Sequence, residues 1–427
     1  MMLKGKHLAG LMAATALATA VAAPANAQSV EELKAQLSAL SKRIEELEKK
    51  QKKSDVVKKA EPAFGLATDD GLFEFNIRGR LYADAAWASD DDGNMDVDAT
   101  EFRTARLGIE GKAWKNTKYK FEADFAGNEV EIKDAYMQYA SEMGKWTFGQ
   151  FKTPNSLEEQ TSSRHTTFME RASFTDAFGL ARMMGIGYGH GGDNWTFNAG
   201  VFRGDAGGSA DDAGQVFAAR LTYGGKFDNG SWLLGASARV RDNDGEDGLR
   251  YRQRPHNHLT DRFVATSRIA EKDSMFGLEA ALQYGSFHVA SEWASLNAKE
   301  GGAGGRDANF YGGYVEAGWF ITGEKKPLKL DKGTWDRPKV KAPLHEGGMG
   351  AWQIAAKFDR IDLTGDGVYG GEQDTVIVGV NWYLNRHTRF MANYSHSSID
   401  KAFDVAANGA DGENGVDALG LRFQVDW

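Results

Sequence analysis

The stretch "FEFNIRGRLYADA", residues 73–85, alternates between apolar and polar side chains. If the stretch is extended, Phe75 and Ile77 point to one face and Arg78 and Arg80 to the other, because successive side chains of a strand point to opposite faces. One face is apolar and the other is ionic. The stretch therefore predicts a β-strand that separates two different environments.

The same alternation recurs along the chain from Leu72 onward. In "YKFEADFA" (119–126) aromatic side chains oppose Lys120 and two acids, and in "DTVIVGVNWYL" (374–384) valines oppose polar side chains. With these three stretches we predict sixteen strands. The other thirteen lie at residues 104–113, 132–140, 145–152, 182–190, 195–203, 214–224, 231–241, 274–284, 286–294, 311–322, 351–361, 388–396 and 416–427.

A soluble β-sandwich also alternates, so other features must distinguish it from a membrane barrel. Short turns such as "GGDN" and "LNRH" alternate with long acidic loops, expected at 89–100 and 242–249. An even number of ten-residue strands with this alternation of turns and loops is typical of outer-membrane barrels, as are aromatic residues at the strand ends. The tryptophans expected near strand ends are Trp87, Trp114, Trp195, Trp232, Trp293 and Trp319.

Composition agrees with a barrel and excludes other classes. The 427 residues include 51 Gly, 24 Phe, 13 Tyr and 11 Trp. The formal net charge of −9 argues against a nucleic-acid partner, which would need a broad basic surface. The chain has no cysteine, so it has neither disulfides nor thiolate metal sites.

The N-terminus predicts export. Lys4 and Lys6 precede an apolar run from Leu8 to Ala23, and "ANAQ" follows, so we predict a signal peptide over residues 1–27. The apolar run has about sixteen residues, fewer than the roughly twenty that span a membrane as a helix.

A heptad pattern follows in "SVEELKAQLSALSKRIEELEKKQ" (29–51). It predicts a coiled-coil helix over 28–53, then a linker over 54–70 and the barrel over 71–427. A single amphipathic helix lying on another surface is the alternative. The a and d positions are Val30, Leu33, Leu37, Leu40, Ile44 and Leu47.

Five stretches resemble the phosphate-selective porin O and P family, in the order in which that family carries them. They are "GQFKTPNSLEEQTSSRHTTFMERA" (149–172), "RPHNHLTDRF" (254–263), "GGYVEAGWFITGE" (312–324), "GAWQIAAKFDRIDL" (350–363) and "GVNWYLNRHTRFMANY" (379–394). The final "LGLRFQVDW" (419–427) also resembles the terminal aromatic strand of bacterial outer-membrane barrels.

The resemblance implies an all-β fold, a sixteen-stranded antiparallel transmembrane β-barrel in the outer membrane of a Gram-negative bacterium, usually as a homotrimer. Outer-membrane lipid and lipopolysaccharide would surround it. The third extracellular loop would fold into the lumen as an eyelet, and basic residues would guide small inorganic anions such as phosphate through it.

Carried over to this sequence, the resemblance places one group of residues on the constricting loop, a second in an arginine ladder and a third in an arginine cluster. A basic pair common in the family reads Arg103-Thr104 here, which removes one expected cation. The three groups are Ser162, Ser163 and Arg164; Arg250, Arg252 and Arg254; and Arg103 and Arg106.

The residues themselves leave alternatives open. Arg78 and Arg80 share a face with Glu74 and Asp84, so they are candidates for the anion pathway or for structural ion pairs. Lys120 likewise shares a face with Glu122 and Asp124. The arginine row in "RYRQRP" (250–255) either meets a passing anion or pairs with Asp244, Glu246 and Asp247 of its own loop.

We therefore expect a porin that lets small hydrophilic solutes diffuse passively, with a preference for anions. A non-selective porin and a barrel that tethers the envelope through its coiled coil are the alternatives. No nucleophile elbow, HExxH or P-loop motif is present, so we expect neither catalysis nor a cofactor. We expect no metal site either, because His256 and His258 lack a matching carboxylate pattern.

Overall fold

The computed structural model describes residues 30–53, 64–68, 70–204, 206, 214–243, 248–400 and 412–427. It divides into two compact units, Met1–Val56 and Val57–Trp427, which are described separately below. The expected signal peptide and most of the expected linker lie outside the described residues.

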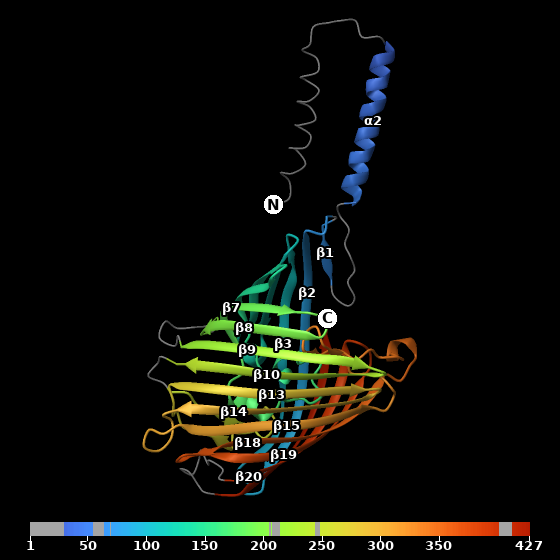
Figure 1. Cartoon of the computed structure of the whole chain (residues 1–427). Helices are drawn as coiled ribbons and strands as arrows, with labels where there is room; N and C mark the ends of the chain where they lie inside the picture. Colours follow the sequence, from blue (N-terminus) through green and yellow to red (C-terminus); the bar gives the residue numbers. More distant parts are fainter. Residues whose placement is uncertain are drawn as a thin grey trace. The chain divides into compact units, whose positions relative to one another are not determined.

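The second unit is a closed antiparallel barrel (Figure 1). Each strand pairs with the next along the chain, and the last pairs with the first, from Asp426 opposite Arg80 to Val416 opposite Asp90. The predicted sixteen-stranded barrel is confirmed, and all sixteen predicted strands are found. They are β2 (Phe73–Asp90), β3 (Asp96–Ala113), β4 (Thr117–Asp124), β5 (Glu131–Ser141), β6 (Gly144–Lys152), β7 (Arg182–Gly191), β8 (Trp195–Arg203), β9 (Gln215–Phe227), β10 (Gly230–Asp242), β13 (Lys272–Tyr284), β14 (Phe287–Lys299), β15 (Ala308–Phe320), β18 (Ala351–Gly365), β19 (Val368–Tyr383), β20 (Thr388–Asp400) and β21 (Asn414–Asp426).

The apolar face of each strand lies on the outside of the barrel and the polar face lines the lumen. Phe121 is 44% exposed whereas the next residue, Glu122, is 1% exposed, and Val376 and Thr375 differ in the same way. A closed barrel satisfies every backbone hydrogen bond between strands, which is what the apolar interior of a membrane requires.

Aromatic side chains gather at the strand ends near the C-terminus of the chain. Trp352 stacks on Trp382 with ring centroids 5.2 Å apart, and Trp382 stacks on Phe390 at 5.9 Å. Such rings suit the boundary between lipid tails and head groups. Of the tryptophans expected at strand ends, Trp114 and Trp319 are among the exposed ones.

Two boundaries differ from the sequence prediction. Residues 89–100 are mostly strand, because β2 and β3 continue to pair up to Ser89 opposite Asp96, and this leaves a loop of only 91–95. The expected linker contains a further strand, β1 (Gly65–Ala67), which pairs with β2 at residues 74–76. β21 pairs with β2 only at residues 80–90 of β2. β1 pairs with the preceding part of β2, which β21 does not reach.

Three long connections fold into the lumen. The loop at 153–181, called the constriction loop here after the role that the family resemblance implies, joins β6 to β7 and carries α3 (Leu157–Gln160) and α4 (Ser173–Ala177). The arginine loop joins β10 to β13, with 243 and 248–271 as its described residues, and carries β11 (Arg252–Gln253) and β12 (Val264–Ala265). The hairpin loop (321–350) joins β15 to β18 and carries β16 (Leu328–Lys329), β17 (Thr334–Trp335) and the 3-10 helix η2 (Leu344–Glu346); a second 3-10 helix, η1 (Ala126–Asn128), follows β4.

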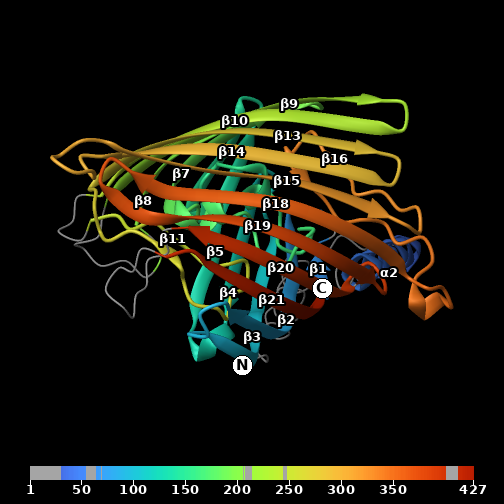
Figure 2. The same ribbon diagram turned by 90° about the horizontal axis from the view of Figure 1, so that it is seen from below.

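These connections pack an apolar core inside the barrel. Phe174 and Phe178 of the constriction loop, Tyr251 of the arginine loop and Trp335 of the hairpin loop belong to one buried cluster with Phe310 of the wall. The wall strands that contribute to it include β10 to β18, which follow one another down the view in Figure 2. The core fills the lumen beside these strands, and an open cavity lies beside β2 to β8.

The first unit contains one described helix, α2 (Val30–Lys53), which agrees with the helix predicted at 28–53. Leu37, Leu40, Ile44 and Leu47 are 50–68% exposed and follow the heptad spacing. Their pairing in a coiled coil stays a prediction. Among the described helices, none combines the length and the apolar character that a membrane crossing needs.

Candidate functional site

The lumen contains a cavity of about 1200 Å³ on the side of β2 to β8. Among the residues that the structure describes, fourteen Arg and Lys residues line it, against seven Asp and Glu residues. The cavity is therefore basic in a chain whose net charge is negative. Among the residues singled out from the sequence, those that line the cavity are Arg78, Arg80, Arg103, Arg106, Lys120, Ser162, Ser163, Arg164 and Arg254.

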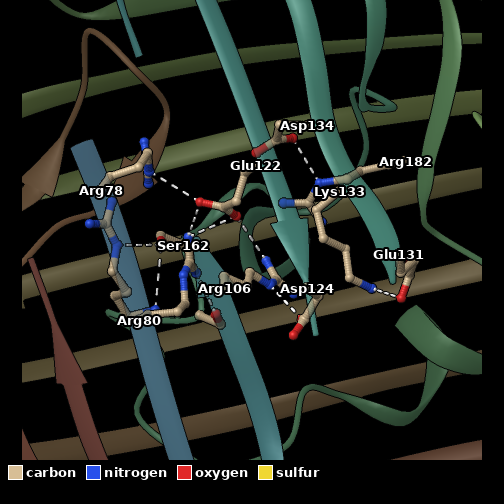
Figure 3. Close-up of polar contacts among 12 residues, drawn as sticks. Arg78, Arg80, Arg106, Glu122, Asp124, Glu131, Lys133, Asp134, Ser162 and Arg182 are labelled. Carbon is tan, nitrogen blue, oxygen red and sulfur yellow. Dashed lines mark hydrogen bonds and ion pairs between the residues drawn. The ribbon is translucent and has the colours of Figure 1, made fainter. Parts of the chain in front are cut away.

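Glu122 of β4 is the centre of a basic cluster on the cavity wall (Figure 3). Its carboxylate lies 3.1 Å from Arg78 Nε, 3.1 Å from Arg80 Nη2 and 3.2 Å from Arg106 Nη1. Arg106 also binds Asp124 at 2.7 Å. Glu122 itself does not line the cavity, so the carboxylate lies behind its three guanidinium groups and these face the open space.

A second carboxylate, Asp134 of β5, is shared by two cations. Arg182 Nε donates to it over 2.7 Å, and Lys120 forms an ion pair with its other oxygen. Two positive charges on one carboxylate leave an excess of positive charge beside the Glu122 cluster.

The ion pairs expected for these residues are present, but with other partners. Arg78 and Arg80 bind Glu122 instead of the acids of their own strand, which pair elsewhere: Glu74 with Lys112 and Asp84 with Arg422. The acids of the same strand are four residues away from each arginine, which is roughly 13 Å along a strand. Facing residues of neighbouring strands have Cβ atoms only about 5 Å apart.

The constriction loop presents its polar edge to this cluster. Arg80 Nη1 donates to Ser163 Oγ over 3.0 Å, and Arg164 Nε donates to Ser162 Oγ over 3.3 Å. The carboxylate nearest to Arg164 is Asp426 at 3.9 Å, and that carboxylate already binds Arg337. The positive charge of Arg164 is thus only partly compensated.

Burial, together with the cations Arg80 and Arg78, lowers the pKa of Arg164 to about 10. Arg164 therefore remains positively charged at neutral pH. A cation whose pKa is lowered by neighbouring cations would be stabilised by an anion that enters the gap between them.

Arg103 binds the far part of the same loop. Its Nη2 lies 3.1 Å from Glu170, and Glu170 is also 3.1 Å from Arg422. Burial opposes ionisation of Glu170, but Arg103 and Arg422 outweigh it and hold the pKa of Glu170 at about 2. Thr104, where the family resemblance implies a second cation, is buried at the cavity wall.

The arginine row does alternate between two faces. Tyr251 and Gln253 are buried, while Arg250 and Arg252 are exposed and Arg254 is half-buried. Only Arg254 of the three lines the cavity.

The arginines of this row also differ in their partners. Arg250 Nε donates to the carbonyl of Thr266 over 3.1 Å, and Arg254 Nε to that of Thr260 over 2.9 Å. Burial and the cations Arg262 and Arg250 lower the pKa of Arg252. The loop acids considered as partners, residues 244, 246 and 247, lie outside the described residues.

Sequence reasoning missed several cations that line the cavity. Arg422 occupies an inward position of "LGLRFQVDW", and Arg182 begins the predicted strand 182–190, so extending the alternation would have found both. Lys152 and Arg171 each lie 3.2 Å from Glu159 of the constriction loop, and no periodic signal marks that pairing.

Comparisons with known proteins found a matching family model and related sequences. The family model described as "Phosphate-selective porin O and P" matches residues 75–427. An uncharacterized protein of Caulobacter vibrioides is 30% identical over 395 residues, which cover 88% of this chain and 77% of the relative. Porin O of Pseudomonas aeruginosa is 27% identical over 395 residues, covering 82% of this chain and 88% of the relative.

Solved structures share the fold. The anion-selective porin from Comamonas acidovorans superposes with a TM-score of 0.56 at 13% identity, covering 82% of this chain and 99% of that one. The outer membrane channel DcaP of Acinetobacter baumannii superposes with a TM-score of 0.52 at 15% identity, covering 85% and 99%. At these identities the likeness shows the fold, which is that of an outer-membrane porin.

Proposed function

The chain belongs to the phosphate-selective porin O and P family, and we propose that its basic constriction favours anions over cations during passive diffusion. The protein is a porin of the outer membrane of a Gram-negative bacterium. Family and fold both point to a channel rather than an enzyme.

The proposal rests on the arginines that the loop and the wall contribute to one cavity. Arg164 of the loop and Arg78 and Arg80 of the wall line it, and the charge of Arg164 is only partly compensated. An anion in the cavity would meet guanidinium groups, whose planar forks match oxyanion oxygens, and the hydroxyl of Ser162 or Ser163 in place of some of its water.

Phosphate is the anion that we propose to pass most favourably. It offers several oxygens to the guanidinium forks and to the serine hydroxyls at once, whereas chloride offers one centre. Binding must stay weak enough for release, and rows of cations meet that need better than one tight site. The ladder would run from Arg254 of the arginine loop to Arg164 and the three arginines around Glu122, all of which line one cavity.

We also propose a homotrimer. A structural neighbour, OmpT of Vibrio cholerae, is described in a trimer form. The Comamonas neighbour is described as anion-selective, which supports the proposed selectivity. A non-selective porin is the second candidate, because several lumen arginines are already paired with carboxylates.

Planar-bilayer recordings would test the selectivity. In a KCl gradient the reversal potential should have the sign of an anion-preferring pore, and added phosphate should block chloride current. Arg164→Gln should reduce both effects, whereas Arg360→Gln, which removes an arginine paired with Glu372 on the outer face, should not. A cation-preferring reversal potential in the unmodified protein would contradict the proposal.

A further inference from the structure

The constriction loop is held from the wall opposite the basic cluster. At the start of α3 the backbone N–H of Leu157 donates to Glu292 Oε2 over 2.8 Å, and the N–H of Glu158 donates to Glu292 Oε1 over 2.7 Å. Glu292 projects inward from β14, whereas the loop leaves the wall at β6. The loop therefore crosses the lumen to reach the carboxylate of Glu292.

The surroundings of Glu292 differ from those of the acids around it. It is 4% exposed, and the hydroxyl of Tyr314 adds a third donor at 3.0 Å. Among the residues that the structure describes, Glu292 forms no ion pair, although its neighbours Glu279 and Glu158 bind Arg220 and Lys357. A buried carboxylate without a cation is costly, and here three N–H and O–H donors offset that cost.

The turn whose N–H groups donate to Glu292 is strained. Ser156 has a φ of 61°, a left-handed conformation that residues other than glycine seldom adopt. Its hydroxyl accepts the N–H of Glu159 over 3.1 Å, so Ser156 and Glu292 together satisfy the first three N–H groups of α3. A strained turn persists only where its surroundings fix it, and Glu292 supplies two of the bonds that do so.

The turn at Ser156 to Glu158 also binds the later part of the constriction loop, at Arg171 and Ala172, through hydrogen bonds. The side chain of Glu158 accepts the N–H of Ala172 over 2.7 Å, and its carbonyl accepts Arg171 Nε over 3.1 Å. Arg171 in turn donates to the carbonyl of Thr161 over 3.0 Å, one residue before Ser162. A continuous set of hydrogen bonds therefore links Glu292 to the edge of the loop that faces the cavity.

We infer that Glu292 is a positioning residue for permeation: by holding the strained turn at Ser156 to Glu158, it sets the position of the loop edge Ser162–Arg164 in the cavity. The inference rests on the proposed function, because it assumes that solutes pass through this cavity. It assigns a role in selectivity to a residue that does not line the cavity.

Glu292→Gln is the decisive variant. It keeps the size of the side chain but replaces one acceptor oxygen with an NH2 group that faces an N–H donor. We expect the channel to fold, as shown by heat-modifiable migration, and to have severalfold weaker phosphate block and a noisier open-channel current. Glu372→Gln, on the outer face, is the matched control and should behave as the unmodified protein does.

The modification rate of an introduced thiol can measure how accessible the loop edge is. Because the chain has no cysteine, Ser162→Cys introduces a single thiol, and its rate of modification by a charged thiol reagent measures access to the loop edge. Adding Glu292→Gln should raise this rate severalfold. If Glu292→Gln changes neither the thiol modification rate, nor the current noise, nor the phosphate block, the inference is overturned.

Tyr314→Phe decides the matter if Glu292→Gln does not fold. It removes one donor and leaves the carboxylate, so it should change noise and block in the same direction but less; unchanged values would again overturn the inference. A cation-preferring unmodified channel would contradict the proposed function instead, and the thiol measurement would still test the positioning role.

Discussion

Arg250 and Arg254 lie four residues apart on the arginine loop, yet only Arg254 lines the cavity. Arg250 is exposed and donates to the carbonyl of Thr266. We expect Arg254→Ala to weaken phosphate block of chloride current and Arg250→Ala to change it little. Block measured over a range of phosphate concentrations checks this. An equal loss of block in the two variants would show that Arg250 also belongs to the anion pathway.

Glu170 should limit how strongly Arg103 and Arg422 attract anions. Glu170→Gln removes the negative charge that both arginines share, so we expect a more anion-selective reversal potential at neutral pH. The pKa of Glu170 is held at about 2, so the carboxylate stays charged as the pH falls from 7 to 4 and loses its charge only near pH 2.

The lowered pKa of Glu170 also predicts how selectivity depends on pH. Between pH 7 and pH 4, Glu170 should contribute no change in selectivity, and any change seen there should persist in Glu170→Gln. Reversal potentials of both proteins over this range test the assignment. A shift in the unmodified protein that Glu170→Gln abolishes would show that Glu170 titrates far above pH 2.

Alternation of residues predicted which side chains face the lumen, but not which of them pair. Arg78 and Glu122 are 44 positions apart and meet only because β3 brings β2 and β4 together in one register. In that register Gly108 of β3 lies opposite Arg78 on one side and Glu122 on the other. A local pattern does not encode the register between strands, so the ion pairs required the structure.

At the scale of elements, strands were easier to predict than connections. Each strand carries its own period of two, whereas the hairpin loop carries no period that marks it as inward. Its Leu330 and Trp335 are buried in the lumen, but in sequence they stand among lysines and aspartates that read as solvated loop. Its place depends on partners such as Arg220, whose Nη2 donates to the carbonyl of Gly333 over 2.6 Å.

The helix α2 should act in association rather than in conduction. Deleting residues 29–53 should leave single-channel conductance unchanged, because the barrel and its cavity lie entirely in the other compact unit. In the full chain, Leu40→Asp should reduce cross-linked oligomers or envelope attachment, whereas Ala39→Asp, off the heptad stripe, should not. Loss of conductance on deletion would contradict this division of roles.

At the scale of the whole molecule, the location of the charge matters more than its sum. The chain carries a net charge of −9, yet Arg and Lys outnumber Asp and Glu two to one around the cavity. The apolar core under the three inward loops fills the lumen beside β10 to β18, and the basic cavity lies beside β2 to β8. We expect a solute that enters this cavity to meet its arginines and lysines at close range.

The hairpin loop should therefore control pore size. Its Lys332 lines the cavity, and the N–H of Trp335 donates to Thr161 Oγ1 of the constriction loop over 3.3 Å. Replacing residues 328–335 with a short Gly-Ser linker should raise conductance and admit larger sugars in liposome-swelling assays, because both the filling and this contact are lost. The same replacement of residues 300–307, an equally long connection between β14 and β15 that does not line the cavity, should change neither. An unchanged size limit in the first variant would mean that the constriction loop alone sets the width of the pore.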